Sequence, residues 1–565
     1  MKHITFLYYF AVLWYNFTMN KDVMTKEYLE KLPPEAVITI CLQNAEMMQM
    51  LSTQLAVLQK QNEEYLKKID ALQENISVLI QQRFGRKTEK FPVNPDQLSL
   101  EMGDVLNEAE ELTENGVEEE PEDVIIVKRT KTKGKRAQDL SKLEKAEPEY
   151  HEISEEELQS RFPNGYTRLA DDVYYEVEYI RARCVLHEHH VAVYAGNRKE
   201  GIVRAEKPER LLKNSIATPS LAAAVINSKY VNAIPLNRVS QELARYDLNL
   251  SKQVLAGWMI RLPERYLHWI VKEMWKELKK SQLIHCDETP FKVTEDAGER
   301  SYMWVYHAGG QQGSKPVFIY EYDPGRSTRV LEASLADFNG VVMTDGYQVY
   351  HTYEKRRGGE LRVAGCWAHA RRKFAEIVKS LDAKDAKAMI AADAVRKIQA
   401  IYHVDNMMRD ASAEERLKHR QASVKPLVDA YFAWVDDPNL TSGMDKSSNL
   451  YRAIQYSRNQ EQFLRVFLTD GSIPLDNNDA ERSIRAFCVG KHNWHISDTK
   501  AGAKASGMLY SIAETAKANG LKPFEYFTYV LEQFLLHAHD EVSSYISDLV
   551  PWSEKIPDRC RKLNT

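Results

Sequence analysis

The chain has 565 residues, more than a single hydrophobic core normally organises, so several domains are expected. Hydrophobic residues make up 44% and charged residues 28%, and the net charge of −5 excludes a protein that binds nucleic acid over its whole surface. The six cysteines include no C-x-x-C pair, which argues against a disulfide framework and favours a reducing compartment.

Residues 1–40 form an N-terminal segment that opens with the apolar stretch MKHITFLYYFAVLWYNF. One interpretation is a signal peptide or membrane anchor, but the run is short for a membrane span and no small-residue cleavage site follows. We favour a start codon assigned too early, with translation beginning at Met19 or Met24. We therefore expect no membrane partner and a cytoplasmic protein.

A heptad pattern marks the next segment, residues 41–90. Its apolar positions are separated by alternating steps of three and four: Met48, Leu51, Leu55, Leu58, Tyr65, Ile69, Leu72, Ile76 and Leu79. Asn62 occupies the remaining position, and a single Asn at an a position favours a two-stranded coil of fixed register. We expect a coiled-coil dimer here. The alternative is an amphipathic helix that packs on its own domain.

Two segments of unusual composition follow the heptads. Residues 91–149 are acidic from Glu101 to Asp123 and basic from Lys128 to Arg136, which predicts a disordered linker. The basic block either contacts DNA phosphates or is a solvated tether. Residues 150–205 alternate as short strands in a small β-rich domain that resembles a degenerate zinc-binding domain.

A cluster of four zinc-ligand residue types lies in that β-rich segment, at Cys184, His187, His189 and His190. A structural zinc site normally takes its four ligands from two spaced pairs, and only one cluster is present. We interpret these residues as part of an exposed strand, which makes zinc doubtful.

Residues 206–275 are predicted to be helical. One helix runs from about Leu236 to Arg245, and Ser251 can cap a second that ends before Pro263. Two short helices with a tight turn indicate a helix-turn-helix DNA-binding domain, although an ordinary helical hairpin has the same pattern. The second helix would present Lys252, Gln253 and Arg261 to DNA.

From residue 280 to 490 the pattern is three strands, a helix, a strand, a helix and a strand, the order expected of an RNase-H-like domain. Asp287 lies at the end of an apolar strand, where an unpaired carboxylate is costly to bury and a metal ion would offset its charge. Glu288 points to the opposite face of the strand, so we exclude it. Asp345 has a similar setting, although Asp-Gly is also a common turn.

Glu481 is the third acidic candidate, in the run PLDNNDAERSIRAF. Local rules favour a structural role, because Asn478 can cap a helix and Glu481 can complete a capping box.

Several motifs resemble the transposases of the insertion-sequence-66 family. The matching runs are FGRKTEK, SKYVNAIPLNRVSQELARYDLNLSKQVLAGWM, HCDETPFKV, MTDGYQVY, GCWAHARRKFAE, PLDNNDAERSIRAFCVGKHNWHIS and SGMLYSIAETAKANGLKPFEY. The resemblance implies an acidic (DDE) triad of Asp287, Asp345 and Glu481, at spacings of 58 and 136 residues. A helical insertion at 376–470 accounts for the second spacing, and residues 491–565 form a C-terminal helical region. The cysteine pair expected upstream of Cys184 is missing, which again argues against zinc.

The family pattern implies two Mg²⁺ or Mn²⁺ ions held by the triad, with Asp287 bridging, cleavage of DNA at element ends and joining of the 3′-hydroxyls to target DNA. Implied partners are DNA, a second copy of the chain and small accessory proteins of the same element, and the implied location is the nucleoid. Further candidate DNA contacts are His369, Arg371, Arg372 and Lys373, after the last core strand, and Lys491 and Trp494, shortly after the helix that carries Glu481. A solvated basic helix face (for the first four) and a core position (for Trp494) are their structural alternatives. A hydrolytic nuclease, a non-catalytic DNA-binding protein and a helical scaffold are the rival functions.

Overall fold

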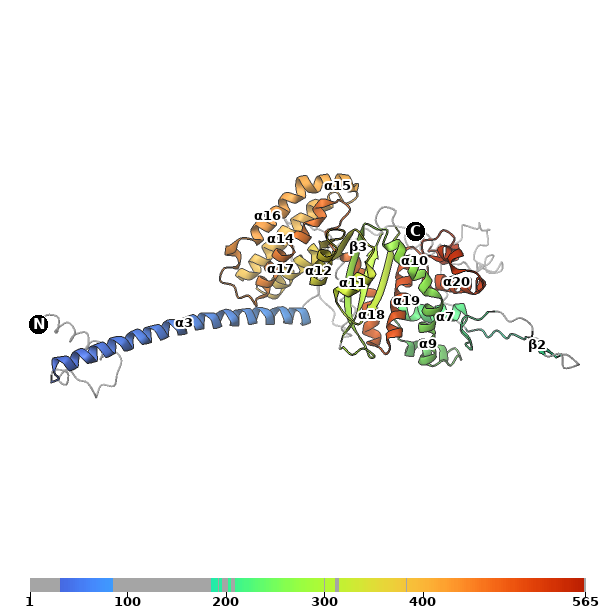
Figure 1. The fold of residues 1–565 in the computed structure, drawn as a ribbon, viewed down its shortest axis with the longest axis horizontal. Helices are drawn as coiled ribbons and strands as arrows, with labels where there is room; N and C mark the ends of the chain where they lie inside the picture. Colours follow the sequence, from blue (N-terminus) through green and yellow to red (C-terminus); the bar gives the residue numbers. More distant parts are fainter. Residues whose placement is uncertain are drawn as a thin grey trace, which may run out of the picture. The chain divides into compact units, whose positions relative to one another are not determined.

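The computed structural model describes residues 31–84, 184–191, 193–195, 202–204, 209–298, 300–309, 315–382 and 384–562 (Figure 1). The chain divides into two compact units, which we call the helical unit (Met1–Asn107 with His369–Gln462) and the sheet unit (Glu108–Ala368 with Phe463–Thr565). Residues 1–30 of the predicted N-terminal segment, the charged linker and most of the β-rich segment lie outside the described residues. No helix in the described ranges is long and apolar enough to span a bilayer.

A five-strand path with the order β5-β4-β3-β6-β7 forms the centre of the sheet unit. The strands are β3 (Leu283–Val293), β4 (Ser301–Ala308), β5 (Val317–Asp323), β6 (Val341–Thr344) and β7 (Arg362–Gly365). The first three form an antiparallel meander, whereas β6 and β7 run parallel to β3. The parallel strands are reached through α11 (Thr328–Ser334) and α12 (Gln348–Arg356), since a parallel connection must cross back over the sheet. The predicted order of strands and helices is confirmed.

The free edge of β5 is covered by α19 (Lys500–Ala518). Ser511 and Thr515, one helical turn apart, accept hydrogen bonds from the backbone N–H groups of Tyr320 (2.8 Å) and Phe318 (3.0 Å). A Cβ atom at Gly507 would lie only 2.6 Å from the carbonyl oxygen of Tyr320, so glycine permits this close approach. The hydroxyl-bearing side chains therefore satisfy an edge that would otherwise expose unpaired backbone groups.

In the described part of the sheet unit, four α-helices precede β3: α7 (Pro219–Ile226), α8 (Leu236–Ala244), α9 (Lys252–Leu262) and α10 (His268–Leu278). The predicted cap of α9 is confirmed, because the Ser251 side chain accepts from the Val254 N–H. Asp247 turns the chain between α8 and α9 with a φ of +62°. The chain stays helical beyond Pro263, which begins a π-helical turn (Pro263–Leu267) leading into α10.

The sheet unit ends in α18 (Asn478–Trp494), a short strand β8 (Ile496–Ser497) that pairs with the end of β3, α19, α20 (Pro523–Leu536) and α21 (Ile546–Leu549). The helix α18 packs on β3 and β4, and α10 and α19 pack on β5. Both faces of the meander are thereby covered, so β4 (SYMWVYHA) is buried at every position except Tyr302.

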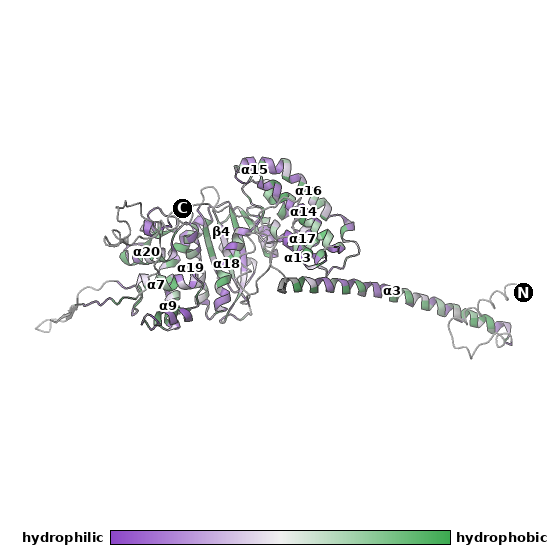
Figure 2. Cartoon of the chain, turned by 180° about the vertical axis from the view of Figure 1, so that it is seen from behind, coloured by the Kyte–Doolittle hydropathy of each residue, from purple (hydrophilic) through white to green (hydrophobic). Residues whose placement is uncertain are grey.

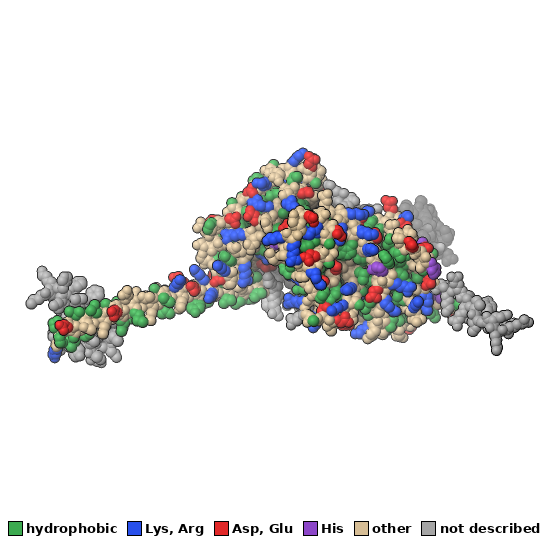
Figure 3. Space-filling view, viewed as in Figure 1, with side chains coloured by type: hydrophobic (Ala, Val, Ile, Leu, Met, Phe, Trp, Pro, Cys, Tyr) green, Lys and Arg blue, Asp and Glu red, His purple; other side chains and the backbone are tan. Residues whose placement is uncertain are grey.

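The helical unit contains α3 (Pro34–Phe84), α14 (Ala386–Asn406), α15 (Ala413–His419) and α16 (Lys425–Val435). It also contains most of α13 (Trp367–Ser380) and of α17 (Asn449–Leu464). The nine apolar heptad positions of α3 are exposed, with 38% to 63% of their surface accessible. Figure 2 marks hydrophobic residues along this helix, and Figure 3 shows hydrophobic side chains at its surface.

A different face of α3 is buried, at Ala71, Glu74 and Val78. Glu74 accepts a hydrogen bond from the Leu450 N–H (2.8 Å) and pairs with Lys387 (3.0 Å). With Leu55 as an a position, Ala71 and Val78 are c positions and Glu74 an f position, which lie opposite the a and d stripe. One face of α3 thus contacts the helices of its own unit, while the predicted dimer face is left open.

Candidate acidic site of the sheet unit

Asp287 lies on the face of β3 that packs against α18. Side chains two residues apart share a face of a strand, and the other members of this row contact α18 or its cap. His285 contacts Asn477 (2.8 Å), the Thr289 hydroxyl accepts from Lys491 (3.1 Å), and Phe291 packs edge-on against Phe487. Asp287 is the fifth of eleven residues in β3, so the prediction that it ends the strand is wrong: the hairpin with β4 extends β3 beyond its apolar part.

Asp345 is brought to the same level by the register of β3 and β6. Leu283 pairs with Val341 and His285 with Met343, an offset of 58 residues. That offset equals the separation of Asp287 from Asp345, so continuing the register by two residues places the two aspartates opposite each other on adjacent parallel strands. Asp345 follows the last residue of β6, and its carboxylate accepts from the Tyr347 N–H (3.0 Å). Gly346 allows the intervening turn with a φ of +89°.

Glu481 lies in the first turns of α18, and its side chain is outside the described part of the structure. The predicted cap at Asn478 is wrong, because Asn478 is the first helical residue and Asn477 is the N-cap. Asn477 directs its amide to β3 instead of to its own helix, so the first turn of α18 starts against the strand that carries Asp287.

Glu288 faces the opposite side of β3 and has partners of its own. Its side chain is 1% exposed, forms a salt bridge with Arg326 and accepts a hydrogen bond from the Tyr350 hydroxyl (2.6 Å). Burial raises the pKa of Glu288, and the nearby Asp345 raises it further, whereas Tyr350 and Arg326 oppose the rise. Asp345 is therefore within electrostatic reach of Glu288 and of Arg326, so acidic side chains gather around this one arginine.

The donor atoms available at this point suit a hard divalent cation. Asp287 and Asp345 supply carboxylate oxygens from neighbouring strands, the ligand type that Mg²⁺ and Mn²⁺ prefer. Among the side chains that the structure describes, which exclude Glu481, no group of three acidic, His or Cys residues is close enough to hold a metal. The chemistry of the two aspartates fits a metal site, and the three-carboxylate ligand set stays a prediction.

The three DNA contacts predicted on α9 are exposed at the surface of the sheet unit. Lys252 and Gln253 begin the helix, and Arg261, near its end, donates a hydrogen bond to the Gly257 carbonyl. The helix is held by buried Leu255, Trp258, Met259 and Leu262.

The other basic candidates lie on two helices. His369, Arg371, Arg372 and Lys373 are in the first turns of α13, within the helical unit, and the Lys373 ammonium lies 4.6 Å from the centre of the Tyr456 ring. Their role stays a prediction.

Lys491 and Trp494 were expected after the glutamate helix, but α18 extends to Trp494, so both lie in its last turn. Lys491 donates to Thr289 and to the Pro290 carbonyl. Trp494 is half-buried and packs edge-on against Phe487, and its role stays a prediction.

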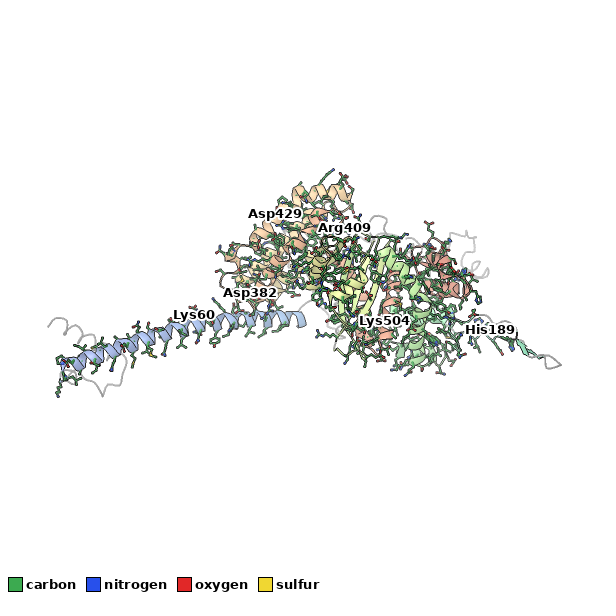
Figure 4. The ribbon with its side chains drawn as sticks, in the orientation of Figure 1. Lys60, His189, Asp382, Arg409, Asp429 and Lys504 are labelled. Atoms are coloured by element: carbon green, nitrogen blue, oxygen red, sulfur yellow. The ribbon has the colours of Figure 1, made fainter. Side chains whose placement is uncertain are left out.

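The cysteine and histidine cluster is not on a strand. Cys184, His187, His189 and His190 are exposed in a segment without regular structure (Figure 4), and the nearest described strands are the hairpin β1 (Val193–Ala195) and β2 (Ile202–Arg204). The expected strand at these histidines is therefore wrong; none of their side chains is fixed by a strand partner in the described part of this region.

Asn477, His285 and Arg326 were missed by the sequence analysis. His285 stands two residues before Asp287 in HCDET, so strand periodicity alone places it on the same face. Asn477 belongs to the DNND run, where a cap was assigned to its neighbour. Arg326 lies in the loop after β5, and its contact with Glu288 depends on tertiary structure that no local pattern reveals.

The sheet unit belongs to the mixed α/β class, and its strand register sets Asp287 and Asp345 opposite each other on adjacent parallel strands. Comparison with known protein families identifies the family. The model described as "Transposase IS66 family" matches residues 214–505, more than half of the chain. "IS66 C-terminal element" matches residues 511–552, and "Transposase C of IS166 homeodomain" matches residues 71–147. The chain therefore belongs to the IS66 family of transposases.

Relatives of this chain occur in Sinorhizobium fredii (strain NBRC 101917 / NGR234). Uncharacterized protein y4jD is 29% identical over 63% of this chain and 70% of its own length. Uncharacterized protein y4qI is 27% identical over 65% of this chain and 68% of its own length. No solved structure matches the chain significantly.

Proposed function

We propose that this chain is a DDE transposase with an RNase-H-like catalytic domain, which cleaves DNA at the ends of its element and joins the freed 3′-hydroxyls to target DNA. The observation that carries the proposal is the register of the sheet: the 58-residue offset between β3 and β6 is also the spacing of Asp287 and Asp345. The strand order β5-β4-β3-β6-β7, with an antiparallel meander followed by parallel strands, supports the RNase-H-like assignment.

Asp287, Asp345 and Glu481 would hold two Mg²⁺ or Mn²⁺ ions. When bound, such a pair activates an oxygen nucleophile and stabilises the leaving oxygen of a phosphodiester. Glu288 is not a ligand in this proposal, because Arg326 and Tyr350 already engage its carboxylate on the other face.

The reaction has two steps in the same site. Water attacks the phosphorus at the element end, and the bond to the 3′ oxygen breaks to leave a 3′-hydroxyl. That hydroxyl then attacks a phosphodiester of the target, which joins the element to the target 5′ phosphate and releases the target 3′ oxygen. The carboxylates, fixed on a rigid sheet, orient the reacting groups for both steps.

The remaining described parts would bring two element ends to two active sites. The exposed residues Lys252, Gln253 and Arg261 on α9 would contact end DNA. The exposed heptad face of α3 would pair with a second copy of the chain, with Asn62 setting the register.

A strand-transfer assay with a pre-cleaved element end tests this function against a nuclease of the same fold. We expect the pre-cleaved 3′ end to appear covalently joined to target DNA when Mg²⁺ is present. Hydrolysis without joined product would support the nuclease, and DNA binding without either reaction would support a non-catalytic protein.

A further inference from the structure

Asn477 is a fully buried side chain that connects α18 to two strands of the sheet. Its amide nitrogen donates to the Cys286 carbonyl of β3 (2.9 Å), and its side-chain oxygen lies 2.8 Å from Nδ1 of His285. Its backbone N–H contacts the sulfur of Cys366, directly after β7 (3.2 Å). Because the amide oxygen can only accept, His285 is the donor, and its ring must carry a proton on Nδ1.

This arrangement departs from the usual behaviour of an N-cap asparagine. Such a side chain normally accepts from the N–H groups of its own helix, which stabilises the start of the helix. In α18 the oxygen accepts from His285 instead, so the local stabilisation of the helix is given up for a contact with the sheet. His285 is itself buried, and its ring lies 5.8 Å from that of His307.

The contact between Asn477 and His285 fixes the position of α18 along the axis of β3. Glu481 follows Asn477 by four residues, a rise of about 6 Å along a helix. Asp287 follows His285 by two residues, a rise of about 7 Å along a strand. Downstream, Thr289 and Phe291 again contact α18, at Lys491 and Phe487, so helix and strand advance in the same direction. The backbone of Glu481 is thereby carried to the level of Asp287.

We propose that Asn477 and His285 are positioning residues, which fix where Glu481 lies along the axis of β3 relative to Asp287 and Asp345. The inference rests on the proposed function, since it assigns the pair a role toward the metal ligands of that site. The two residues would act by placing α18, the helix that carries Glu481, and would contact neither the metal ions nor the DNA.

The affinity for Mn²⁺, measured by electron paramagnetic resonance of the free ion in titrations of the full-length protein, tests this inference without requiring catalysis. Loss of a residue that orients a metal ligand typically weakens metal affinity roughly 10–100-fold. We expect an increase in the Mn²⁺ dissociation constant of that size for Asn477→Ala and for His285→Ala. His285→Gln keeps an N–H donor and should recover part of the affinity.

Asn519→Ala is the matched control. Asn519 is also an asparagine at a helix end whose amide donates to a strand-side carbonyl, that of Pro316 (2.9 Å), but it lies at the end of α19. Its replacement should leave the Mn²⁺ dissociation constant unchanged. Where Asn477→Ala does not fold, His285→Ala and His285→Gln decide the question, because Gln keeps an N–H donor that Ala lacks.

Asp287→Asn separates the failure of this inference from the failure of the proposed function. If Asp287→Asn binds Mn²⁺ as tightly as the wild type, the metal site itself is wrong. If Asp287→Asn loses Mn²⁺ while the Asn477 and His285 variants keep wild-type affinity, the metal site stands and the positioning role is overturned.

Discussion

Two buried glutamates, one in each unit, show how the same side chain is used in different surroundings. Glu74 on α3 and Glu288 on β3 are each 1% exposed in their side chains, and each is paired with a cation. Glu74 meets Lys387 and a backbone N–H, and it fastens α3 to its own unit. Glu288 meets Arg326 and Tyr350 but also lies near Asp345, which raises its pKa.

The different surroundings of Glu74 and Glu288 indicate a different role for each part of the molecule. At Glu74 the charges are compensated and the contact serves to hold a helix. At Glu288 further carboxylates gather on the neighbouring positions of the same strands, an arrangement that is costly unless cations compensate it. The acidic residues near Glu288 therefore fit the metal site that we propose for this part of the sheet.

The largest effect on stability is expected from Lys387→Ala. This variant leaves Glu74 buried without its cation, and breaking one side of a buried pair costs about 3–5 kcal/mol. Urea denaturation followed by circular dichroism should show that loss in the transition of the helical unit. Lys397→Ala, which removes a surface pair with Asp393 on the same helix, should cost about 1 kcal/mol or less. Equal losses in the two variants would mean that Glu74 does not depend on Lys387.

A smaller, pH-dependent effect is expected from Glu288→Gln. A carboxyl whose pKa is raised in the folded chain binds more protons when folded than when unfolded, so its contribution to stability is lost as the pH rises. The unfolding midpoint of the wild type should therefore fall relative to that of Glu288→Gln as the pH rises above 4.5, the ordinary pKa of this group.

Glu332→Gln is the control for that pH dependence, since Glu332 is a surface residue paired with Arg356. Its midpoint should follow the wild type across the same pH range. A wild-type midpoint that rises relative to Glu288→Gln would contradict the raised pKa of Glu288.

The smallest effect on stability, but a clear effect on assembly, is expected from Asn62→Val. A buried Asn at an a position sets register and oligomeric state at some cost in stability. Analytical ultracentrifugation should show a dimer for the wild type and a mixture of oligomers for the variant. Lys60→Val changes an f position, which lies opposite the a and d positions of the heptad, and should leave the dimer unchanged. A monomeric wild type would show that the exposed face of α3 does not pair with a second copy.

Much of the sheet could be predicted from the sequence because its signals are local. Apolar runs such as LIHC and VVMT fix the strands, and the strand period separates Asp287 from Glu288. The cap of α9 at Ser251 is likewise a local pattern. The heptads of α3 predicted a helix, but the burial of Glu74 depends on residues more than 300 positions away in the sequence.

The cap of α18 shows where local rules fail. Asn478 and Glu481 have the spacing of a capping box, yet Asn477 is the cap, because His285 and the Cys286 carbonyl offer it partners on the sheet. The extension of β3 beyond Asp287 is also a tertiary effect, since β4 pairs with a stretch that is no longer continuously apolar.

The central claim is that Asp287, Asp345 and Glu481 act together on DNA, and Mg²⁺-dependent nicking of element-end DNA tests it most directly. The variants Asp287→Asn, Asp345→Asn and Glu481→Gln should each reduce nicking to background while binding end DNA as the wild type does. Asp323→Asn, at the end of β5 and paired with Arg329, should nick normally. Nicking that persists in any of the three variants would contradict the account.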